Sequence, residues 1–101
     1  MKFYIKHSMT GRLRVHMDMK HMSFKQADIL EYYIKNIETV TSVKVYEKTC
    51  DAVIEFKGNK AQIINELKHF TYSQVAVPED VLNSSGREMN SYYQDKLVNK
   101  V

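Results

Sequence analysis

The sequence predicts an α+β domain with the ferredoxin-like βαββαβ order, in which a four-stranded antiparallel sheet carries two helices on one face. Alternating apolar positions mark the strand segments, and apolar positions three or four residues apart mark the helices. The composition agrees with a globular domain, because 44% of the 101 residues are hydrophobic and 27% are charged. We expect this domain to span residues 1–78, followed by a linker and amphipathic helix over 79–101.

Residues 3–17 form the first predicted strand region. Apolar side chains recur at every second position, first as Phe3 and Ile5 and later as Leu13, Val15 and Met17. Gly11 lies between the two stretches. It is compatible with a bulge in one long strand or with the turn of a hairpin, and the sequence leaves both open.

Two helices are predicted from apolar faces and from capping residues. The first covers 23–38, where Ser23 and Gln26 form an S-x-x-Q capping box. The second runs from Asn59 to about Phe70. Their inward-facing residues are Ala27, Leu30, Ile34 and Ile37 in the first and Ile63, Ile64, Leu67 and Phe70 in the second.

The remaining predicted strands lie at 41–48, 52–57 and 73–77, and Pro78 ends the last of them. The first two are close enough to form a hairpin. Residues 79–86 are polar and turn-rich, which indicates a linker. A terminal helix is expected over 85–101, with a narrow apolar stripe at Met89, Tyr93, Leu97 and Val101.

The formal net charge is only +3, but the charge is unevenly distributed. Residues 1–25 hold six basic side chains and a single acid, Asp18. Such a basic region attracts phosphate, nucleic acid, anionic lipid or an acidic protein surface. The single cysteine, Cys50, excludes an internal disulfide framework, and no apolar run is long enough for a membrane span.

Several stretches together resemble one family. They are HS at 7–8 followed by GRLRV at 11–15, MSFKQADILEYY at 22–33, VYEKT at 45–49, DAVIE at 51–55, and the tail segments NSSGREMN at 83–90 and YQDKLV at 93–98. This pattern is similar to a divergent subgroup of the heavy-metal-associated domain, the N-terminal cytosolic domain of bacterial heavy-metal-transporting P-type ATPases.

The resemblance implies a regulatory or metal-handling domain of a longer divalent-cation pump, at the cytoplasmic face of the cell membrane. Its partners would be the other cytosolic domains of the same ATPase, and it would meet the membrane only through the rest of the chain. The ATP site would lie outside these residues, so this domain alone is not expected to be an enzyme.

The sequence departs from the family at the metal site. The family binds soft ions through a Cys-x-x-Cys pair, and the resemblance places Ser23 and Gln26 at the two cysteine positions. Soft-metal binding by thiolates is therefore lost there. Replacement ligands are available nearby in His16, Asp18 and His21, which suit a weakly bound divalent ion such as Zn²⁺.

A metal-free alternative is docking through basic side chains. The expected docking residues are Arg12, Arg14, Lys20 and Lys25. A rival from another class is a nucleic-acid-binding module of ferredoxin-like fold, with strand aromatics at Phe3, Tyr4, Tyr46 and Phe56. We do not expect nucleic acid as the partner, because the net charge is small and the basic-Gly-aromatic signature is missing.

Overall fold

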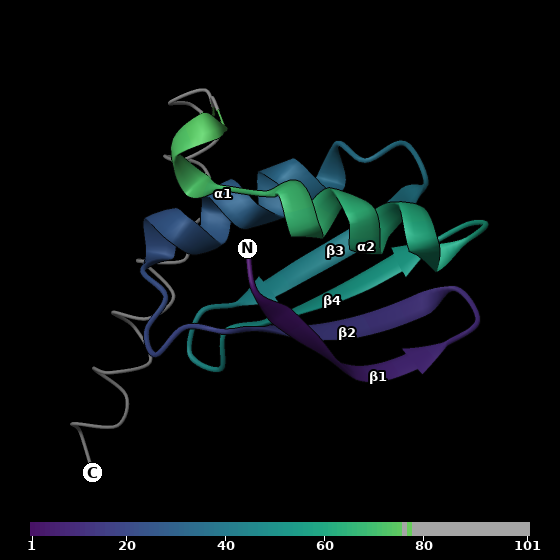
Figure 1. Cartoon of the computed structure of the whole chain (residues 1–101), viewed down its shortest axis with the longest axis horizontal. Coiled ribbons are helices and arrows are strands. Elements are labelled where there is room, and N and C mark those ends of the chain that lie inside the picture. Colours follow the sequence, from purple (N-terminus) through teal and green to yellow (C-terminus); the bar gives the residue numbers. More distant parts are fainter. Residues whose placement is uncertain (76, 78–101) are drawn as a thin grey trace, which may run out of the picture.

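The computed structural model describes residues 1–75 and residue 77, which form a four-stranded antiparallel sheet with both helices on one side (Figure 1). The order of the strands in the sheet is β1-β2-β4-β3. The elements are β1 (Phe3–Met9), β2 (Arg12–Met17), α1 (Phe24–Lys35), β3 (Val40–Tyr46), β4 (Asp51–Phe56), α2 (Lys60–His69) and a 3₁₀ helix (Tyr72–Gln74). The α+β class and the four-stranded antiparallel sheet are confirmed.

The order of the elements corrects the prediction, because the described residues run ββαββα rather than βαββαβ. The expected strand at 73–77 is wrong: Tyr72–Gln74 is a 3₁₀ helix, and Val75 and Val77 are not in a strand. The physical reason lies at the other end of the chain. β1 already pairs with β2 and occupies the sheet edge at which the last strand was expected.

Gly11 is a hairpin turn, which settles the alternative that the sequence left open. Its φ of +76° lies in the left-handed region, where glycine has no steric penalty. Met9 therefore pairs with Arg12 across a two-residue turn. A bulge is also present, but it lies in β1, where the register shifts between Ile5 and His7.

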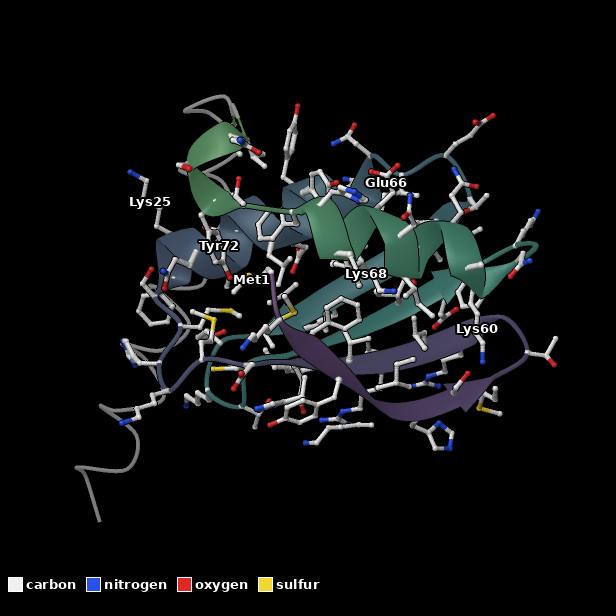
Figure 2. The ribbon with its side chains drawn as sticks, viewed as in Figure 1. Met1, Lys25, Lys60, Glu66, Lys68 and Tyr72 are labelled. Atoms are coloured by element: carbon white, nitrogen blue, oxygen red, sulfur yellow. The ribbon has the colours of Figure 1, made fainter. Side chains whose placement is uncertain are left out.

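Two contacts with α2 hold β1 at its edge position. The N-terminal amine of Met1 donates to the carbonyl oxygen of Lys68 at 3.0 Å, near the end of the helix. Lys60 Nζ donates to Ser8 Oγ at 2.9 Å, near the start of the helix. Figure 2 labels Lys60 and Lys68 near the two ends of α2. The hairpin is thus tied at both ends to the layer above it.

The core fills the space between the sheet and the two helices. The predicted inward-facing residues are confirmed as buried, with Ile64 half-buried at the margin. From the sheet the core receives Leu13, Val15, Met17, Val45, Ala52, Ile54 and Phe56. The capping box is also confirmed, since Ser23 Oγ accepts from Gln26 N at 3.0 Å and Gln26 Oε1 accepts from Ser23 N at 2.9 Å.

None of the helices in the described part of the chain is long and apolar enough to cross a membrane. The predicted linker and helix at 79–101 lie outside the described residues.

We expect Gly11→Ala to lower the free energy of unfolding by about 1–2 kcal/mol, because a side chain at this φ is strained. The added Cβ would also lie 3.4 Å from the carbonyl oxygen of Phe56. Gly58→Ala is the matched control, since Gly58 has φ +87° but no atom within 4 Å of the position of a Cβ. In urea unfolding, the free energy of unfolding of Gly11→Ala should be no higher than that of Gly58→Ala. A Gly11→Ala variant as stable as the wild type would refute the turn.

Candidate functional site

The candidate site lies on the sheet face opposite the helices, which no described helix covers (Figure 1). Alternation along β2 decides which residues point there. Leu13 and Val15 are fully buried on the helix side, so Arg12, Arg14 and His16 project from the open face. The same alternation in β4 sends Asp51, Val53 and Glu55 to the open face.

The strand register arranges these side chains in three rows across the sheet. The first row is Tyr4, His16, Asp51 and Tyr46; the second is His7, Arg14, Val53 and Lys44; the third is Met9, Arg12, Glu55 and Ser42. Each row draws one residue from each strand. The open face is therefore mainly polar and basic, with a tyrosine at each end of the first row.

A buried carboxylate organises the face. The side chain of Asp51 has no exposed surface, although it lies on the open side. Its Oδ2 accepts from Lys6 Nζ at 3.1 Å and from Arg14 Nε and Nη2 at 3.2 and 2.9 Å. Its Oδ1 lies 2.7 Å from Nδ1 of His16. Four polar contacts from β1 and β2 thus enclose one carboxylate.

These contacts determine the charge of Asp51. Burial by itself raises the pKa of the carboxyl, but the hydrogen bonds from His16, Arg14 and Lys6 outweigh burial and lower the pKa from 3.8 to about 2. Asp51 is therefore ionised at neutral pH. Because an ionised carboxylate only accepts hydrogen bonds, Nδ1 of His16 carries the proton in this pair.

The β3–β4 turn fixes the position of Asp51. Cys50 adopts φ +59°, and its side chain is buried in the core. Its carbonyl oxygen accepts from the backbone N–H of Met17 at 2.8 Å, which joins the turn to the end of β2. Burial, followed by the charge of Asp51, raises the pKa of the Cys50 thiol. The thiol is thus a packing group that places its neighbour, and it is a poor nucleophile.

The structure does not assemble the predicted metal ligands. His16 contacts Asp51 and stacks on Tyr4, with ring centroids 5.1 Å apart, whereas Asp18 and His21 are exposed in the loop after β2. Within residues 1–75 and 77, no group of three or more His, Cys, Asp or Glu side chains is placed to hold a metal ion. Ser23 and Gln26 are engaged with each other in the helix cap.

The four predicted docking residues divide into two pairs. Arg12 and Arg14 lie on the open face, on adjacent rows. Lys20 lies in the loop after β2. Lys25 is the second residue of α1 and is labelled beside the first turn of that helix in Figure 2. Both lysines are exposed, but neither lines the hollow on the open face.

A hollow of about 570 Å³ opens beside Arg14. Its lining residues are Lys6, His7, Met9, Arg12, Arg14 and Val53. Sequence reasoning missed Lys6 and Asp51 as site residues, because their role depends on which strands become neighbours. The signal that was available is the alternation in β4, which places an acid at 51 on the same face as Arg14.

We expect Asp51→Asn to remove a pH dependence of stability. The pKa of Asp51 is depressed in the folded state, so its ionised form stabilises the fold above its ordinary value of 3.8, and this stabilisation disappears as the pH falls toward about 2. The difference corresponds to about 2 kcal/mol. Urea unfolding at pH 7 and at pH 2 should show this loss in the wild type.

The matched control for this experiment is Glu55→Gln, an exposed carboxylate on the same strand and the same face. Glu55→Gln should lose as much free energy of unfolding between pH 7 and pH 2 as the wild type, whereas Asp51→Asn should not show this loss. Equal acid sensitivity in Asp51→Asn and in the wild type would mean that other carboxyl groups carry the effect.

Comparison with known proteins gives no match: no family model, no curated protein and no solved structure is similar to the chain. The geometry of the open face is therefore the basis on which a function is proposed for this chain.

Proposed function

We propose that this chain is a non-catalytic docking domain that binds an acidic protein surface through the open face of its sheet. The single observation that carries the proposal is the excess of cations on that face. Four cationic side chains lie there, which are Lys6, Arg12, Arg14 and Lys44, against the two carboxylates Asp51 and Glu55. Asp51 is buried beneath its partners, so a partner protein meets the cations first.

The arrangement of the cations also favours docking. Arg14 is held by Asp51, and Lys44 lies with its Nζ 5.8 Å from the ring centroid of Tyr46. Cations held in place lose less side-chain freedom when a partner binds, so more of the attraction appears as affinity. The side chain of Arg12 makes no hydrogen bond or ion pair within residues 1–75 and 77, and its guanidinium remains available to the partner.

The sequence resemblance suggests where such a surface is found. We propose that the domain is the N-terminal regulatory part of a heavy-metal-transporting P-type ATPase and docks against that pump's other cytosolic domains. The sandwich of sheet and helices would then be a variant of the ferredoxin-like arrangement, with β1 in place of the last strand. In this proposal the domain has no ATPase activity of its own.

A nucleic-acid partner is the second candidate, because Tyr4 and Tyr46 are 55% and 42% exposed on the open face. Of the predicted strand aromatics, Phe3 and Phe56 instead face the core. The two tyrosines stand at opposite sheet edges, about 14 Å apart at interstrand spacings of roughly 4.8 Å. On the two central strands this row holds His16 and Asp51 rather than Phe, Tyr or Trp, so the two tyrosines do not form a continuous stacking surface for bases, and docking to protein is preferred.

Charge reversal tests the docking proposal. We expect Arg12→Glu/Lys44→Glu to weaken binding of poly-L-glutamate, a probe for an acidic surface, by about tenfold. Both residues lie outside the contacts of Asp51, so the fold should be retained. The matched control is Lys20→Glu/Lys25→Glu, which changes the net charge equally but away from the open face.

Amide shifts of the isolated domain would report the binding surface in this experiment. An equal loss of affinity in both double variants would mean that only net charge matters and would refute the proposal. Tighter binding of a single-stranded oligonucleotide, lost in Tyr4→Ala and Tyr46→Ala, would favour the second candidate. In the full-length pump, Arg12→Glu/Lys44→Glu should alter metal-activated transport.

A Zn²⁺ titration tests metal handling separately. Because His16 Nδ1 is engaged with Asp51 and the other candidate ligands are apart, we expect no saturating amide shifts confined to residues 16–26. Saturating, stoichiometric shifts that disappear in His16→Ala/His21→Ala would instead make the domain a metal sensor. Cu⁺ under reducing conditions provides the parallel test for the thioethers of Met19 and Met22, which lie in the loop between β2 and α1.

A further inference from the structure

The β1 bulge places two consecutive side chains on one side of the hollow. In the hairpin register Ile5 pairs with Val15, and His7 pairs with Arg14. Lys6 is therefore the extra residue of the bulge, and both Lys6 and His7 line the hollow. A regular strand would have sent one of them to the opposite face. The bulge thus adds a cation to a position that already faces two arginines.

Asp51 fixes the orientation of Arg14 in the hollow but uses only part of its N–H groups. A guanidinium has five N–H groups. The Nε and Nη2 atoms each direct one N–H to Asp51 Oδ2, which leaves three. Asp51 is fully buried, whereas the side chain of Arg14 is 44% exposed. The carboxylate therefore holds the guanidinium from below, while almost half of the arginine side chain remains exposed to solvent.

The charges around the hollow do not cancel. Lys6, Arg12 and Arg14 bring three positive charges, and the carboxylate of Asp51 brings one negative charge, which leaves +2. Glu55 is the cross-strand neighbour of Arg12, but it is exposed and is not among the lining residues. His7 adds an imidazole at the rim. Met9 and Val53 complete the lining with apolar surface.

We infer that this hollow is an oxyanion site that binds a phosphomonoester or inorganic phosphate. A phosphate group carries a charge between −1.5 and −2 at neutral pH and offers three acceptor oxygens, so it matches three separate cations and their net charge of +2. A single carboxylate has one charge and two oxygens, and it satisfies fewer of these donors. The inference goes beyond the proposed docking function and does not depend on it.

Two sources can supply this chemistry, a free phosphorylated compound or the headgroup of phosphatidic acid. Titration of the ¹⁵N-labelled protein with inorganic phosphate and with pyrophosphate tests the first. Titration with phosphatidylcholine vesicles that contain phosphatidic acid, against pure phosphatidylcholine vesicles, tests the second. We expect saturable amide shifts confined to residues 6–14 and 53 with at least one probe, weakened by added NaCl.

Two single variants separate this site from the docking surface. Arg12→Ala should weaken phosphate binding by about tenfold, since it removes one charged donor from the hollow. Lys44→Ala, on the same face but outside the hollow, should leave it unchanged. Poly-L-glutamate binding, by contrast, should decrease in both variants, so the two proposals can fail independently.

The oxyanion site is refuted by any of three results. These are an absence of saturable shifts with all probes, shifts spread equally over Lys20, Lys25 and Lys44, and equal phosphate affinity in Arg12→Ala and in the wild type. Neither variant removes a partner of Asp51, so both should fold, and their far-ultraviolet circular dichroism and urea midpoints check this.

Discussion

The open face of the sheet depends on the burial of one ionised carboxylate. Removing a charged group from water is strongly unfavourable unless hydrogen bonds and opposite charges replace the lost solvation. Asp51 meets this condition with contacts from three side chains on β1 and β2. The helices cover only the other face. On the open face, the contacts of Asp51 hold the strands together, as apolar packing does in the core. It joins the edge hairpin to the middle of the sheet.

The same requirement makes the face basic. A carboxylate that needs several donors draws Lys6, Arg14 and His16 together, and they outnumber the charge that they neutralise. Their side chains remain partly exposed on the open face, at 46% for Lys6 and 44% for Arg14. Stability and the proposed binding are therefore linked in this cluster. Removing Arg14 would leave the buried Asp51 with fewer hydrogen bonds and destabilise the fold, and it would also remove a binding group. Arg12 and Lys44 do not contact Asp51, so substituting them tests binding without weakening the support of the buried charge.

The sequence was sufficient to predict the core, because the apolar period in α1, α2, β2 and β4 is strong and each such residue is buried except Ile64, which is half-buried. It also predicted the Ser23–Gln26 cap, which is a local interaction within one turn. The order of the elements was less accessible. Whether Gly11 bends one strand or reverses the chain is decided by the pairing of β1 with β2 in the assembled sheet, and the alternation of apolar residues is the same in both cases.

The candidate site was predictable only in part for the same reason. Arg12 and Arg14 could be placed on one face by alternation, but their neighbour in space is Asp51, which pairs with β2 only once the sheet is assembled. Lys20 and Lys25 are close to them in sequence but lie in the loop after β2 and in α1, outside the hollow. Adjacency along the chain suggested one basic cluster, whereas the strand register divides it and adds Lys6 and Lys44 from other strands.

The separation of the cations on the open face from Lys20 and Lys25 has an energetic consequence for anion recognition. An exposed lysine in a loop or at a helix end must give up rotamer freedom to hold an anion, which offsets much of the attraction in water. Arg14 has already lost that freedom to Asp51, and the bulge brings Lys6 to the same carboxylate at 3.1 Å. An anion that enters the hollow therefore meets donors that are largely ordered beforehand. For equal formal charge, the open face should bind anions more tightly than the pair Lys20 and Lys25, and the reason is the buried acid beneath it.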